Sequence, residues 1–131
     1  MLKLIYLVAC LCTLLNGAWM IVSPLSWYTD FPAAIPHTGR FNPHFVRDIG
    51  LAYLVAALGF GWCALNLGRS RPVHLGLTLF FGGHALVHLY EILTGYLPHT
   101  HWLIDAPLVF LPALLLLALA VPSFRRRLGE R

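Results

Sequence analysis

Three ionisable side chains recur along one apolar stretch of the sequence. His84, His88 and Glu91 lie four and three residues apart, and at 100° per residue a helix would place them within about 60° of one another on one face. A histidine pair spaced i, i+4 offers two imidazole nitrogens to a transition metal, and a carboxylate suits the same ions. The pattern therefore predicts a site for zinc, iron or copper.

A second polar group opens the preceding apolar stretch. His44 and Asp48 are one helical turn apart, with Arg47 beside them. At a rise of about 1.5 Å per residue, Asp48 lies ~7–8 Å below a helix start at Pro43, and Glu91 lies ~9 Å from the end of its own helix. Because charged groups in a bilayer face the protein interior and have partners, we expect both groups to share one pocket.

We therefore predict one intramembrane site near the outer leaflet. Arg47 would balance charge or hold an anionic cofactor or substrate. The predicted metal ligands are His44, Asp48, His84, His88 and Glu91.

The same residues allow two other interpretations. Titratable chains inside membranes serve as proton or ion relays. Arg47 could instead pair with Asp48 or Glu91 only to hold helices together, as in a structural or accessory subunit of a membrane complex. With neutral histidines these three charges sum to −1, so either a divalent cation or one proton would offset that charge.

Other polar residues are expected to play smaller roles. His99 and His101 fall in a predicted outer loop, where histidines are usually solvated. Asp105 is expected to be a helix N-cap, with support of the metal site as the alternative. Contacts with water or lipid headgroups are expected for His37, Arg40 and His74.

These residues must be positioned by helices that lie in lipid. The chain is 59% hydrophobic and only 11% charged, whereas a soluble domain carries roughly 25% charged residues. About 20 apolar residues cross a hydrocarbon core of ~30 Å. Four stretches qualify, and they predict an all-α integral membrane protein, an antiparallel four-helix bundle forming a single transmembrane domain over 1–131. The stretches cover about 4–22, 45–67, 75–97 and 107–124.

The basic residues predict the orientation of this bundle. Arg40 and Arg47 fall on one side, whereas seven basic residues fall on the other, and basic residues favour cytoplasmic segments. Both termini are therefore expected in the cytoplasm, and the net charge of +4 is an orientation signal, so no nucleic-acid partner is predicted. The seven are Lys3, Arg69, Arg71, Arg125, Arg126, Arg127 and Arg131.

Local signals mark some boundaries and contacts. The long loop 23–42 is expected to fold back over the outer mouth of the bundle. Asn42 is a strong N-cap and Pro43 suits the first helical position, so a helix should begin there. Close helix contacts are expected at Gly59, Gly61, Gly76, Gly82 and Gly83.

Two segments carry a family resemblance. Residues 41–54 read FNPHFVRDIGLAYL and residues 84–91 read HALVHLYE. Both are similar to a group of small bacterial four-helix membrane proteins of uncharacterised activity, and the size and layout are distantly similar to DoxX-like membrane proteins. The resemblance implies a bacterial inner-membrane location. It also implies that the second and third helices form one site.

The sequence thus predicts a small multi-pass protein of the bacterial inner membrane with a metal site that opens to the bilayer. Metal-assisted redox chemistry on a lipophilic small molecule is the natural reaction class if the protein is an enzyme. The predicted partners are the lipid bilayer, such a molecule, and other copies or subunits of a membrane complex. A proton relay and a purely structural network remain the alternatives.

Overall fold

The computed structural model describes residues 1–129, and every regular element in that range is helical. Four helical segments are long and apolar enough to cross a membrane, with mean hydropathy between 1.2 and 2.4. They are α1 (Leu2–Val22), α3 (Pro43–Leu65), α4 (Arg71–Leu93) and a segment from His101 to Ala120. Four such helices indicate a multi-pass membrane protein.

The last crossing segment contains three elements. These are α5 (His101–Asp105), a π-helical turn η3 (Ala106–Phe110) and α6 (Leu111–Ala120). The sequence predicted a helix start near 107, but this segment begins at 101. Proline lacks a backbone N–H and so removes helical hydrogen bonds, and Pro107 and Pro112 distort this helix without ending it.

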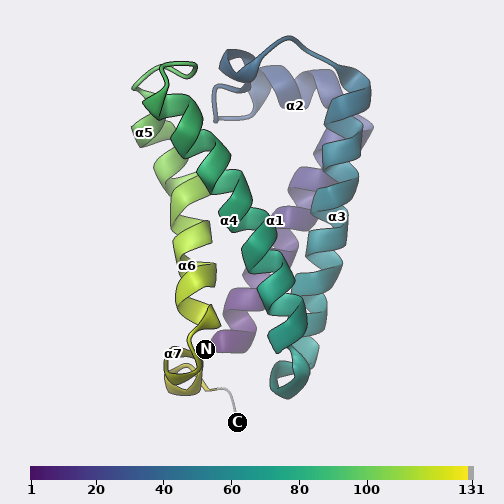
Figure 1. Cartoon of the computed structure of the whole chain (residues 1–131). Helices are drawn as coiled ribbons and strands as arrows, with labels where there is room; N and C mark the ends of the chain where they lie inside the picture. Colours follow the sequence, from purple (N-terminus) through teal and green to yellow (C-terminus); the bar gives the residue numbers. More distant parts are fainter. Residues whose placement is uncertain (130–131) are drawn as a thin grey trace.

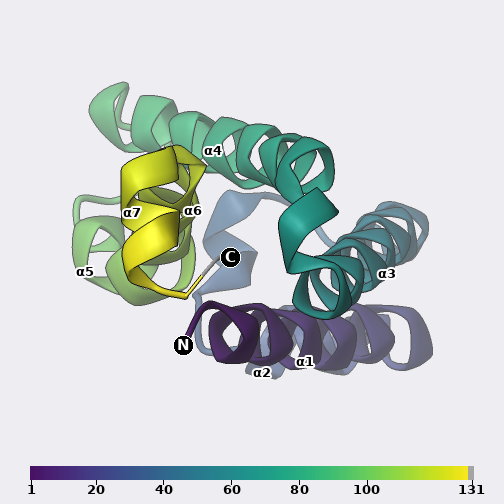
Figure 2. The ribbon, with the colours of Figure 1, turned by 90° about the horizontal axis from the view of Figure 1, so that it is seen from below.

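The helices form two pairs that converge at one end of the molecule. α1 lies beside α3, and α4 lies beside α6 (Figures 1 and 2). We call the end that holds Met1 and residues 122–129 the termini end and the opposite end the α2 end. α4 starts beside α3 at the termini end and leans away from it toward α5 at the α2 end (Figure 1).

Short helices close the two ends. At the α2 end, α2 (Pro24–Asp30) and a 3₁₀ turn η1 (Ile35–Thr38) form the long connection that the sequence predicted over the bundle mouth. At the termini end lie a 3₁₀ turn η2 (Leu67–Arg69) and α7 (Pro122–Arg127). The predicted cap is present, because the Asn42 side chain accepts hydrogen bonds from the backbone N–H groups of His44 and Phe45, each 3.1 Å long.

The closest helix contact is made by glycines that the sequence analysis did not single out. A Cβ on Gly17 would lie 2.7 Å from the Gly50 carbonyl oxygen, so α1 and α3 touch backbone to backbone. By contrast, a Cβ on Gly76, Gly82 or Gly83 would meet nothing within 4 Å. The prediction of close contacts at these three was wrong, because no neighbouring helix comes within contact distance of them.

A buried polar network holds the termini end together. The Arg125 guanidinium is 2% exposed and donates from Nη1 to the Tyr6 hydroxyl and from Nη2 to Ser70 Oγ, both at 2.7 Å. The Tyr6 hydroxyl lies 3.0 Å from Nδ1 of His74, whose Nε2 lies 3.1 Å from the Leu116 carbonyl oxygen. The expectation that His74 contacts water or headgroups was therefore wrong, since this network buries it completely.

Candidate functional site

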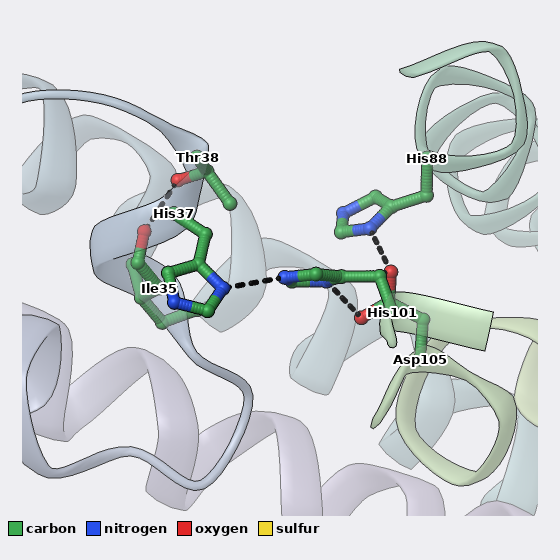
Figure 3. Close-up of polar contacts among 6 residues, drawn as sticks. All are labelled: Ile35, His37, Thr38, His88, His101 and Asp105. Carbon is green, nitrogen blue, oxygen red and sulfur yellow. Dashed lines mark hydrogen bonds and ion pairs between the residues drawn. The ribbon is translucent and has the colours of Figure 1, made fainter. Parts of the chain in front are cut away.

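A chain of polar side chains crosses the α2 end of the molecule. Nδ1 of His37 lies 3.1 Å from Nε2 of His101, and Nδ1 of His101 lies 3.2 Å from Oδ2 of Asp105 (Figure 3). The same Oδ2 lies 2.8 Å from Nδ1 of His88. Four side chains from η1, α5 and α4 are thus linked in one line, which we call the His–Asp chain.

The local structure explains this arrangement. His101 and Asp105 are four residues apart on α5, so they share one face. Gly95 adopts φ +78 in the turn after α4, a conformation that glycine reaches without steric cost. This turn folds α5 back against the last turns of α4, which brings Asp105 to His88.

Burial changes steeply along the His–Asp chain. Asp105 is 1% exposed and His101 is fully buried, whereas His37 is exposed at the surface. The side chain of His88 is 14% exposed. Burying a carboxylate away from water is costly unless it has partners, and the two imidazoles supply hydrogen bonds to Asp105. The chain therefore connects solvent to a buried negative charge.

The donors and acceptors follow from chemistry. An ionised carboxylate only accepts hydrogen bonds, so Nδ1 of both His88 and His101 must donate to Asp105. If His101 is otherwise neutral, its Nε2 carries a lone pair and accepts a hydrogen bond from Nδ1 of His37. Asp105 therefore fixes which nitrogen of each neighbouring ring carries a proton.

His84 extends this line further along α4. Its ring packs edge-on against His88, with 4.6 Å between ring centroids and 69° between ring planes. Across residues 1–129, the His84 ring forms no hydrogen bond to any protein group. His84 is therefore the open end of the line, nine residues from the end of α4 and ~13–14 Å along its axis.

The other predicted ligands lie elsewhere. His44 Nε2 pairs with Asp48 Oδ2 at 3.3 Å, and these side chains are 87% and 55% exposed at the start of α3. Arg47 donates from Nε to the Ile21 carbonyl oxygen at 3.3 Å, in the last turn of α1. α3 and α4 diverge toward this end (Figures 1 and 2), so the structure describes two separate groups in place of one pocket.

The metal set expected from the sequence is not assembled in the described part of the chain. Within residues 1–129, no group of three or more His, Cys, Asp or Glu side chains is arranged to hold a metal ion. Glu91 is half-buried on α4 and forms no ion pair with another described residue. Metal binding therefore stays a prediction.

Three members of the His–Asp chain were missed. The solvation expected for His101 and the N-cap expected for Asp105 do not hold, because both side chains are buried and Asp105 makes no cap hydrogen bond. His37 lies at the surface as expected, but its contact with His101 was not predicted. One signal was available. The i, i+4 spacing of His101 and Asp105 next to an apolar run repeats the spacing of His84 and His88.

Comparison with known proteins adds no relative to this description. No family model, curated protein or solved structure matches the chain.

Proposed function

We propose that this protein is a membrane proton relay, which carries protons between the water at its α2 end and His84 inside the crossing helices. The observation that carries the proposal is the hydrogen-bonded line from exposed His37 through His101 and Asp105 to His88, against whose ring the His84 ring packs. Chains of titratable groups within membranes are functional by default, because they are costly to keep there.

Charge supports this role. With neutral imidazoles the His–Asp chain carries the single negative charge of Asp105, and one added proton brings it to zero. Imidazole and carboxylate groups exchange protons readily along hydrogen bonds. The line can therefore hold one mobile proton without leaving a net charge in the low-dielectric interior.

The hydrogen bonds define a sequence of transfers. A proton that binds Nε2 of His37 releases the Nδ1 proton of that ring to Nε2 of His101. His101 then passes its Nδ1 proton to Asp105. Protonation of Asp105 removes the acceptor that holds the proton of His88 on Nδ1, so this ring can take the tautomer with its proton on Nε2. Nδ1 of His88 then accepts the Asp105 proton, and the Nε2 proton leaves toward His84, whose ring is in contact with His88 but not hydrogen-bonded to it. Each step forms one N–H or O–H bond and breaks another.

The test measures proton exchange at the buried end. The full chain, labelled with ¹⁵N-histidine and placed in lipid nanodiscs, gives separate ring signals whose linewidths report exchange with water. We expect His101→Gln to slow exchange at His84 and His88 at least tenfold. His44→Gln is the matched control, because His44 belongs to the exposed pair at the same end and has no contact with the His–Asp chain.

Two results would decide against the relay. If exchange at His84 is unchanged in His101→Gln, protons reach it by another route. If the His84 ring exchanges no protons in the wild type, the network is structural and only holds α4 against α5.

A transition-metal site is the second candidate. The observation in its favour is that Asp105 accepts from Nδ1 of His88, an arrangement that leaves Nε2 as a ligand atom and typically supports metal-bound histidines. His84 would supply a second nitrogen, and a lipophilic molecule or water would complete the coordination. Stoichiometric zinc, iron or copper in purified protein, lost in His84→Ala and in His88→Ala, would establish this function and displace the relay.

We further propose that the termini end faces the cytoplasm of a bacterium, in its inner membrane. Exposed basic residues gather there, which favours the cytoplasmic side. They are Lys3, Arg69, Arg71, Arg126 and Arg127, against Arg40 and Arg47 at the α2 end; Arg131 lies outside the described residues. A reporter enzyme that is active only in the cytoplasm, fused to the C-terminus, tests this orientation. Activity supports it and inactivity of an expressed fusion refutes it.

A further inference from the structure

An apolar groove runs between α4 and α6, on the opposite side of α4 from the histidines. Its volume is about 640 Å³, within the range of roughly 300–1,000 Å³ typical of ligand sites. At 100° per residue, Leu86 in its lining lies about 200° from His84. The groove therefore does not belong to the His–Asp chain.

Two glycines give the groove its depth. Gly82 and Gly83 both line it, and a Cβ on either would meet no atom within 4 Å. Glycine costs about 1 kcal/mol relative to alanine inside a helix, and here it allows no close helix contact in return. The space that their side chains would fill remains part of the groove.

The opposite wall is shaped by an irregular helix. Phe110 belongs to the π-helical turn η3 and lines the groove together with Trp102, with 5.8 Å between their ring centroids. Single π-helical turns are rare and are frequent at functional sites. This turn is an observation independent of the glycines, and it falls on the same groove.

The surroundings determine the chemistry of an occupant. Both walls belong to segments that can cross a membrane, and the lining is almost wholly apolar. From Leu75 to Leu89 the groove follows fifteen residues of α4, or ~21 Å along the helix axis. This stretch is centred on the middle of α4, at residue 82 of 71–93, so the groove runs from the α2 half of a ~30 Å hydrocarbon core past its midplane.

We propose that this groove holds one acyl chain of a phospholipid from the leaflet at the α2 end, bound once per protein. Trp102 lies at the α2 end of the groove, and indole rings favour the headgroup level of a membrane. The acyl chain would lie along Gly82 and Gly83 with its headgroup near Trp102. This site is independent of the relay, so either proposal can fail without the other.

Native mass spectrometry of the full chain in mild detergent tests the site. We expect wild-type protein to retain one phospholipid, and Gly82→Leu to reduce the retained fraction at least fivefold by filling the groove. Gly76→Leu is the matched control. Gly76 lies on the same helix with equally open space, but it does not line the groove, so this variant should retain lipid like the wild type.

Other outcomes overturn the proposal. Equal lipid retention in Gly82→Leu and Gly76→Leu would show that the lipid binds elsewhere. A wild-type dimer without lipid, lost in Gly82→Leu, would assign the groove to a second copy of the chain. If Gly82→Leu loses helical circular dichroism and so does not fold, a quenching measurement on the wild-type protein tests the site instead. Phosphatidylcholine with brominated acyl chains, added to the wild-type protein, should quench the fluorescence of Trp102, which is the part of the signal absent from Trp102→Phe. This quenching should saturate at one lipid per chain. Quenching that does not saturate would refute the site.

Discussion

Replacing Asp105 by asparagine removes the charge at the centre of the His–Asp chain while keeping its shape. Asp105 accepts from Nδ1 of His88 at 2.8 Å and from Nδ1 of His101 at 3.2 Å. The asparagine amide keeps one oxygen, which can still accept from both rings at the Oδ2 position, but it replaces the other oxygen by an NH2 donor. At the Oδ1 position this NH2 group would lie 3.3 Å from Nδ1 of His101, so two donors face each other unless the His101 ring rotates or moves its proton to Nε2.

The expected energies follow from these bonds. A hydrogen bond to a charged group contributes about 1.5–3 kcal/mol, so Asp105→Asn should lower the free energy of unfolding by about that amount. Asp105→Ala leaves two buried N–H groups without an acceptor and should cost about 1–3 kcal/mol for each of them. Asp48→Asn is the control, because its exposed pair with His44 should contribute about 0–1 kcal/mol.

Two measurements check this prediction. Unfolding in sodium dodecyl sulfate, followed by helical circular dichroism, gives the free energies. The ¹⁵N shifts of the histidine rings show which nitrogen carries the proton, and His101 should change from Nδ1–H to Nε2–H in Asp105→Asn. If Asp105→Asn costs no more than Asp48→Asn and both rings keep their Nδ1 protons, the central role of Asp105 is refuted.

Three further predictions concern the scaffold. Gly50→Val should cost about 1–3 kcal/mol of unfolding free energy, because a Cβ there would lie 2.9 Å from α1 side chains; an equal cost for Gly76→Val, measured by the same unfolding, would contradict this. Asn42→Ala should cost about 1 kcal/mol through loss of the α3 cap, and no change in the unfolding curve would refute the capping role. Hydrogen bonds from the hydroxyls of Thr29 and Ser26 lower the pKa of Asp30 below its ordinary value of 3.8. The ionised carboxylate therefore stabilises the folded state fully above pH 3.8, and this stabilisation is lost as the pH falls through the lowered pKa. Tryptophan fluorescence should show an acid step only below pH 3.8 that Asp30→Asn lacks, and a step above 3.8 would contradict the assignment.

The fold was largely predictable because lipid imposes simple rules. Length and hydropathy located four crossing helices, and the residue pair Asn42–Pro43 marked the start of α3 correctly. The start of the last segment was missed because two prolines disguise a helix that continues through a π-helical turn. Such a turn depends on packing, which the sequence does not display.

The site was only half predictable. Helical spacing placed His84 and His88 on one face, and the structure packs them together. The error was to choose their partners by depth alone, which pointed to His44 and Asp48 on α3. The depth of a residue in the membrane does not specify the tilt of its helix. Because α4 leans toward α5, His88 is hydrogen-bonded to Asp105 instead. Tilt is a property of the whole set of helix contacts, so no local motif reports it.

The convergence of the helix pairs at the termini end has a mechanical consequence. α4 is 23 residues long, or ~34 Å. Because the network around Arg125 holds the helix pairs together at the termini end, a small rotation about that end moves the α2 end of α4 the most. A rotation of about 2° between the pairs displaces the far tip by roughly 1 Å over that length, enough to part His37 from His101. Helices change their tilt when the thickness of the bilayer changes. Membrane thickness would then change the His37–His101 distance, and with it the hydrogen-bonded connection between Asp105 and the water at the α2 end.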